Sequence, residues 1–185
     1  MKLFVPIALL LSVITFTSQA HNLKIGHSVP AVKVQHQGEI FWHHNKITFA
    51  PWSSSQMVGK VRIIQAIAGR SSAKAMNARL MQAITKAEFD SNRYQTTTIV
   101  NQDDSIWGTG SFVKSSAISA KKEYPWSSIV LDENGQVAAR WHLKPESSAI
   151  IVQDKNGKIL YTHEGKLSQD EIEHVLHLVQ VELHS

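Results

Sequence analysis

Eight mostly apolar residues, Val61–Ala68, restrict the possible folds more than any other part of the sequence. A run of this kind is typical of a strand that is buried on both faces, as in parallel sheets. Gly69, Ser71 and Ser72 interrupt the run, and the apolar spacing then predicts a helix over residues 73–87. The β-branched residues 96–100 predict the next strand. Together these segments predict a parallel βαβ unit.

Turn signals predict three hairpins outside this unit. Gln37-Gly38 lies between the β-prone residues 32–34 and 40–42, which predicts an N-terminal hairpin. Asn134-Gly135 and Asn156-Gly157 predict two more turns, because both pairs suit positive φ. The strands expected around these two turns are residues 129–131, 137–141, 149–152 and 158–161.

Two further helices complete the predicted elements. A weaker helical pattern covers residues 111–122, and the capping-box pattern from Ser168 to Glu171 opens a final amphipathic helix. No repeat or linker divides the chain, so residues 21–185 are expected to form one domain. The expected fold class is α/β: a central mixed β-sheet flanked by helices, with an extra N-terminal β-hairpin.

The first 20 residues have the pattern of a cleavable signal peptide. Lys2 supplies a positive charge, residues 3–16 are mostly apolar, and Ser18 and Ala20 are the small residues that signal peptidase prefers. Cleavage is therefore expected between Ala20 and His21. An uncleaved anchor is the alternative, although the apolar stretch is short for a permanent membrane helix. We expect an exported protein with no stable membrane insertion after cleavage.

Several stretches resemble thioredoxin-like thiol reductases and peroxiredoxins, in the order in which those proteins carry them. They are Gly59-Lys60-Val61-Arg62-Ile63-Ile64, Thr98-Ile99-Val100-Asn101, Tyr124-Pro125-Trp126 with residues 129–132, and residues 148–158. Longer stretches resemble the YtfJ family of small exported proteins of Gram-negative bacteria. These are Gly59-Lys60-Val61-Arg62, Ile67-Ala68-Gly69-Arg70, residues 93–101 and Tyr124-Pro125-Trp126. The resemblance implies a thioredoxin-like fold and a periplasmic location, but it implies no reaction.

The sequence departs from working thioredoxin-like enzymes at their reactive positions. Those enzymes carry W-C-x-x-C where a strand meets a helix, and the helix start activates the first thiol. The matching positions here are Ser71 and Lys74, and the position of the enzymes' cis-proline falls at or near Ser148. The chain contains no cysteine, which excludes disulfide exchange and thiol peroxidase activity.

The residues around these positions form a candidate ligand site. Arg70, Ser71, Ser72 and Lys74 offer two cations, two hydroxyls and a helix start, which suit a phosphate, a carboxylate or a peptide C-terminus. Plain N-capping by Ser71 or Ser72, with both cations solvated, is the simpler interpretation. A catalytic Ser71 would also need a base and an oxyanion hole, which no motif in the sequence supplies.

Histidines offer a second, weaker candidate site. Asp170, His174 and His177 share one stripe of the last helix with His184, and could hold Zn²⁺ or Cu²⁺ on its surface. A solvated polar face is the simpler interpretation, since no motif with ligand spacing is present. His21 would become the N-terminal residue after cleavage and could chelate copper, or it could be a frayed end.

Tryptophans form the third group of candidates. Trp52 and Trp107 lie beside turn signals and could line a peptide groove, although core or half-buried packing is the simpler interpretation for both. Core or sheet-edge packing is expected for Trp126 and Trp141.

Our leading hypothesis is a non-catalytic periplasmic protein that binds a peptide or protein partner and needs no cofactor. The candidate ligand-binding residues are Arg70, Ser71, Ser72, Lys74, Trp107 and Ser148. The alternatives are a histidine-based metal-binding protein and a serine hydrolase that uses Ser71. The net charge of +4 is scattered along the chain, so nucleic-acid binding is not expected.

Overall fold

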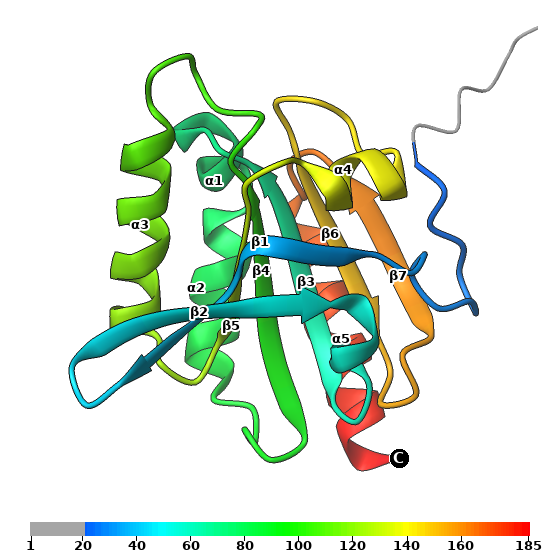
Figure 1. The fold of residues 1–185 in the computed structure, drawn as a ribbon. Coiled ribbons are helices and arrows are strands. Elements are labelled where there is room, and N and C mark those ends of the chain that lie inside the picture. Colours follow the sequence, from blue (N-terminus) through cyan, green and yellow to red (C-terminus); the bar gives the residue numbers. More distant parts are fainter. Residues whose placement is uncertain (1–20) are drawn as a thin grey trace, which may run out of the picture.

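The computed structural model describes residues 21–185, which form a seven-stranded mixed sheet with helices on both faces (Figure 1). The strand order is β2-β1-β5-β4-β3-β6-β7. The predicted signal peptide, residues 1–20, lies outside the described residues. The α/β fold class, the central mixed sheet and the extra N-terminal hairpin are confirmed. None of the helices within residues 21–185 has the length and apolar character needed to cross a membrane.

The predicted βαβ unit forms the centre of the sheet. Strand β3 (Val61–Ala68) is buried at every position and pairs in parallel with β4 (Tyr94–Asn101), which pairs in parallel with β5 (Ser128–Asp132). Helix α3 (Gly110–Glu123) connects β4 to β5. The helix predicted over residues 73–87 is divided into α1 (Ser71–Met76) and α2 (Ala78–Ala87).

The C-terminal hairpin and helix also agree with the sequence pattern. Strand β6 (Ser148–Gln153) pairs antiparallel with β3 and with β7 (Ile159–Glu164), and Asn156-Gly157 lies in the turn between β6 and β7. Helix α5 (Gln169–His184) begins with the predicted capping box, in which Ser168 and Glu171 satisfy each other's backbone N–H groups.

The N-terminal hairpin has its turn at a different place from the predicted one. Strand β1 (Lys33–His43) runs through Gln37-Gly38, and the chain reverses at His44-Asn45 before β2 (Lys46–Ser53). Gln37 and Gly38 have positive φ because they form a bulge. More residues of β1 than of β2 therefore lie between the pairs Val34–Trp52 and Glu39–Ala50. The turn prediction was wrong because a bulge and a turn share the same residue preferences.

A second correction concerns the segment after β5. Residues 137–141 were predicted as a strand, but they belong to helix α4 (Gln136–Trp141). Asp132 accepts a hydrogen bond from the Val137 N–H at 2.7 Å, and Gly135 has a φ of 65° at the N-cap. Val137 and Trp141 are four residues apart, so a helix turns both toward the sheet and buries them.

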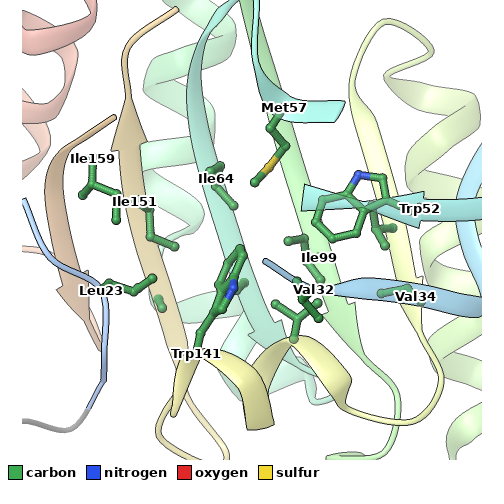
Figure 2. Close-up of a cluster of buried hydrophobic side chains, with 14 residues drawn as sticks. Leu23, Val32, Val34, Trp52, Met57, Ile64, Ile99, Trp141, Ile151 and Ile159 are labelled. Atoms are coloured by element: carbon green, nitrogen blue, oxygen red, sulfur yellow. The ribbon is translucent and has the colours of Figure 1, made fainter. Parts of the chain in front are cut away.

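The hydrophobic core has two layers, one on each face of the sheet. On one face α2 and α5 pack against β3 and β6, while Ala73 of α1 and Ala117 of α3 join a neighbouring cluster. On the other face α4 and part of the β1–β2 hairpin cover the strands (Figure 1). Figure 2 shows Trp141 pointing from α4 into this second layer, toward Ile64 and Ile151.

Candidate functional site

The junction between β3 and α1, where the resemblance places the reactive thiols of related enzymes, carries two exposed serines. Ser71 and Ser72 begin α1, and both are exposed. Neither caps the helix, because the N-cap residue is Arg70 and its side chain makes no capping bond. The N-capping prediction for the serines was therefore wrong. Among residues 21–185, the Ser71 hydroxyl makes no hydrogen bond to a histidine or a carboxylate, so the hydrolase alternative gains no support.

Arg70 does not offer a free positive charge to a ligand. Its Nε lies 3.1 Å from Asp104 Oδ1, and its Nη2 lies 3.1 Å from Glu146 Oε1. Asp104 also accepts a hydrogen bond from the backbone N–H of Glu146 at 2.6 Å. Arg70 therefore holds together the two loops that follow β4 and α4, and two carboxylates balance its charge.

Lys74 and Ser148, the other predicted members of the site, are separated from each other. Lys74 is exposed on α1, and its Nζ donates to Ser116 Oγ of α3 at 3.4 Å. Ser148 is only 1% exposed, and its hydroxyl accepts a hydrogen bond from Asn77 Nδ2 at 3.0 Å. Ser148 thus belongs to the core, whereas Lys74 lies on the surface with the two serines.

Asn77 is the residue that sequence reasoning missed at this position. Besides Ser148, its Nδ2 donates to the Gly165 carbonyl at 2.8 Å, and its Oδ1 accepts from the Leu167 N–H at 3.0 Å. The side chain is 1% exposed and lies at the break between α1 and α2. An asparagine inside an otherwise helical pattern is a weak signal for such a role, because its partners are distant in sequence.

Large apolar side chains are exposed where the loop after β4 leads into α3. Trp107 is 98% exposed, Phe112 73% and Ile106 57%. We call these three residues the Trp107 patch. Two hydrogen bonds brace the loop: Thr109 Oγ1 donates to the Ile106 carbonyl and Gln102 Nε2 to the Gly110 carbonyl, each at 2.6 Å. The same loop is joined to α1 through the ion pair between Arg70 and Asp104.

Trp52, Trp126 and Trp141 differ in burial, and only part of this agrees with the prediction. Trp52 is buried in the core, which agrees with the simpler interpretation and rules out its role in a groove beside Trp107. Trp141 is buried as expected, and its Nε1 donates to the Pro30 carbonyl at 2.8 Å. Trp126 was expected to pack in the core or over a sheet edge, yet it is 62% exposed and lies edge-on to Tyr124.

The structure does not bring the proposed metal ligands together. In residues 21–185, no three His, Cys, Asp or Glu side chains are positioned to hold a metal ion. His174 packs edge-on against Tyr161, with ring centroids 5.6 Å apart. His184 Nδ1 is 2.6 Å from the Gln180 carbonyl oxygen of its own helix. Asp170 and His177 therefore remain separate surface groups on α5.

A cleft of about 450 Å³, which the sequence did not indicate, opens at the carboxyl ends of β3, β4 and β5. Its base includes Ala66, Ile99 and Ala149, and helix α4 with the loop after it forms one wall. Four carboxylates line it, those of Asp103, Asp104, Asp132 and Glu164. The cleft is thus apolar at its base and acidic around it.

Asp132 is the buried carboxylate of this cleft. Its side chain is 0% exposed, Oδ2 accepts from the Val137 N–H, and Oδ1 has no hydrogen-bond partner among the described residues. Burial raises the pKa of Asp132, and the nearby charge of Asp103 adds to this, while the backbone N–H groups of Val137, Gln136 and Asn134 act in the opposite direction. Asp132 Oδ2 therefore accepts a hydrogen bond from the first turn of α4, while no group of the described residues makes a hydrogen bond to Oδ1.

Sequence comparison identifies close relatives along nearly the whole chain. A family model described as a bacterial protein of unknown function, YtfJ_HI0045, matches residues 23–182. The uncharacterized protein YtfJ of Escherichia coli strain K12 is 43% identical over 174 residues, covering 94% of this chain and 95% of the relative. An uncharacterized protein of Haemophilus influenzae is 46% identical over 160 residues, covering 86% and 87%.

Solved structures agree on the fold at much lower identity. The thioredoxin domain of a thiol-disulfide oxidoreductase from Bacteroides vulgatus superposes with a TM-score of 0.52 at 16% identity, covering 84% of this chain and 97% of that one. The reduced 2-Cys peroxiredoxin of Plasmodium vivax superposes with a TM-score of 0.54 at 14% identity, covering 87% of this chain and 99% of that one. At such identities the likeness concerns the fold alone. The chain therefore belongs to the YtfJ family, with a thioredoxin-like fold and no cysteine.

Proposed function

We propose that this protein is a non-catalytic binding protein of the periplasm, which recognises a peptide or protein partner through the Trp107 patch. Ser71, Ser72 and Lys74 would flank the contact as its polar rim. Export rests on the signal-peptide pattern of residues 1–20. The lack of any cysteine supports a role without thiol chemistry.

The exposure of Trp107 is the observation that carries this proposal. A tryptophan that is 98% exposed, close in sequence to an exposed isoleucine and phenylalanine, places much apolar surface in water. Such surface is typical of contact sites, and tryptophan is enriched among the residues that dominate binding energy. The braced loop holds the patch in place, so a partner would meet a surface that is already ordered.

The partner test compares Trp107→Ala with Trp126→Ala. Trp126 is also exposed, but it follows the other end of α3, which is roughly 20 Å long. Immobilised protein is incubated with a periplasmic extract, and specific partners are those displaced by excess free wild-type protein. A partner retained by wild type and Trp126→Ala but lost by Trp107→Ala is expected. Equal retention by both variants would refute the proposed surface.

Localisation has its own test. Osmotic shock should release the protein in the periplasmic fraction, with an N-terminus at His21 by mass spectrometry. Retention in the cytoplasm with an intact residue 1–20 segment would remove the export half of the proposal.

The two alternative functions gain no support from the described residues. The candidate metal ligands remain apart, and Ser71 has no base or carboxylate within hydrogen-bond distance. We therefore propose neither in place of the binding role.

A further inference from the structure

The acidic cleft beside α4 is separate from the Trp107 patch and has its own chemistry. It lies at the carboxyl ends of three neighbouring parallel strands, the usual place for ligands in open α/β sheets. Its volume of about 450 Å³ is within the range of small-molecule sites.

The charge of the cleft favours a cation. Four carboxylates line it, and the positive groups are Lys144 and, when protonated, His142, both on exposed positions of the loop after α4. Two of the carboxylates already have partners. Asp104 binds Arg70, and Glu164 Oε1 accepts from the Lys144 N–H at 2.8 Å. Asp103 and Asp132, like Glu164, form no ion pair within residues 21–185, so their negative charge is available to a ligand.

Asp132 supplies an independent indication that the cleft is incomplete without a ligand. Its Oδ1 is buried and unpaired, although a buried carboxylate oxygen normally has a donor. Asp103 lies beside the turn at Gly135, where an added Cβ would be 3.3 Å from the Asp103 Cβ, and it is near enough for its charge to act on Asp132. A donor with a positive charge, placed between them, would satisfy both groups.

The composition of the cleft also restricts the kind of cation. No three His, Cys, Asp or Glu side chains of residues 21–185 are arranged to hold a metal ion. The apolar lining of the cleft includes Ala66, Ile99 and Ala149, which suit an apolar body. A ligand with an alkyl chain and a charged end would use both features.

We propose that this cleft binds a small organic cation, an alkyl ammonium or alkyl guanidinium, with its charged group attracted by the carboxylates of Asp103 and Asp132 and its alkyl chain on the apolar base. The cation is either a free amine or the side chain of a lysine or arginine in a peptide. Both sources present the same chemistry to the cleft.

The test titrates cadaverine, agmatine and the neutral diol 1,5-pentanediol into isotopically labelled protein, followed by amide NMR. The amines should saturate with a Kd below about 1 mM and shift the amides of Asp103, Gly135 and His142, while the diol should not bind. A second arm compares the peptide acetyl-Gly-Lys-Gly-amide with its Nζ-acetylated form. Binding of the diamine alone assigns a free amine, and binding of the unacetylated peptide assigns a side chain.

Three variants decide whether the carboxylates are responsible. Asp132→Asn and Asp103→Asn should each weaken amine binding by at least about tenfold. Glu133→Gln removes the same charge from the exposed neighbouring position and should stay within about twofold. If Asp132→Asn does not fold, Asp103→Asn decides alone, because that residue is exposed. Absence of saturation, equal binding of the diol, or unchanged affinity in the Asn variants would overturn the proposal and leave Asp132 as a helix cap only.

Discussion

A single buried side chain, that of Asn77, joins three segments that are far apart in sequence. It binds the first residue of β6, the carbonyl of Gly165 after β7, and the N–H of Leu167 before α5. The break between α1 and α2 occurs at this residue because its side chain turns inward to these partners. We therefore interpret the break as a structural connection between the helical layer and the C-terminal hairpin.

Replacing Asn77 should lower the free energy of unfolding more than replacing its partner Ser148. Asn77→Ala leaves the Leu167 N–H and the Gly165 carbonyl without their side-chain partners, and we expect a loss of about 2–4 kcal/mol in the free energy of unfolding. Ser148→Ala removes one bond and should cost about 1 kcal/mol. Urea denaturation of both variants measures this, and equal losses would contradict the assigned role.

Asp132 should give the protein a pH-dependent stability that its asparagine variant lacks. Because burial raises the pKa of Asp132 in the folded state, the folded protein binds its proton more tightly than the unfolded chain. This contribution to stability is complete at a pH below the pKa of Asp132 in the unfolded chain. It is lost as the pH rises through the pKa of Asp132 in the folded protein. The free energy of unfolding of Asp132→Asn should thus increase relative to that of wild type as the pH rises from 3 to 7. A difference in unfolding free energy that is independent of pH would show that Asp132 is not responsible.

The candidate site was only partly predictable at the residue scale. The chain order placed Ser71 and Ser72 just before the predicted helix and Lys74 in its first turn, and the structure shows all three exposed on α1. Arg70 and Ser148 could not be assigned from sequence, because their partners come from distant segments. Burial of Ser148 and neutralisation of Arg70 depend on the tertiary structure alone.

At the scale of elements, prediction succeeded where a pattern is long and failed where a short run fits two structures. Strand β3 is an apolar run of eight residues and helix α5 has sixteen residues with a helical period, and both were predicted. Helix α4 has only six residues, and its apolar positions allow a strand or a helix. The helix is favoured because the Val137 N–H donates a hydrogen bond to Asp132 and because the helix buries Trp141.

The bulge in β1 requires a glycine at position 38, which gives a prediction about the stability of the hairpin. Gly38 has a φ of 76°, and a Cβ added there would lie 2.1 Å from the Ala50 carbonyl oxygen. Gly26 has a φ of 78° but no atom within 4 Å of such a Cβ, so it controls for backbone strain. We expect Gly38→Ala to lower the unfolding free energy by at least about 2 kcal/mol more than Gly26→Ala. Thermal denaturation compares the two variants. Similar losses in unfolding free energy would mean that the β2 backbone at Ala50 can move away from an added Cβ at little energetic cost.

Across the whole molecule, a thioredoxin-like scaffold is kept while the positions matched to its reactive groups hold other side chains. The core does not need those groups, because two apolar layers enclose the sheet from both faces. The edge of the sheet where β3 meets α1 instead presents two serines, a lysine and, on the adjoining loop, the Trp107 patch. The same edge also contains the acidic cleft, so two different surfaces lie at one end of the molecule.

The most direct test of recognition through this edge is site-specific photo-crosslinking in living cells. A benzoyl-phenylalanine is placed at position 107 and, as the control, at position 126, in otherwise identical proteins that include residues 1–20. We predict a discrete crosslinked product at position 107, formed only after irradiation, and none of the same mass at position 126. Identical products at both positions, or none at position 107, would contradict the account.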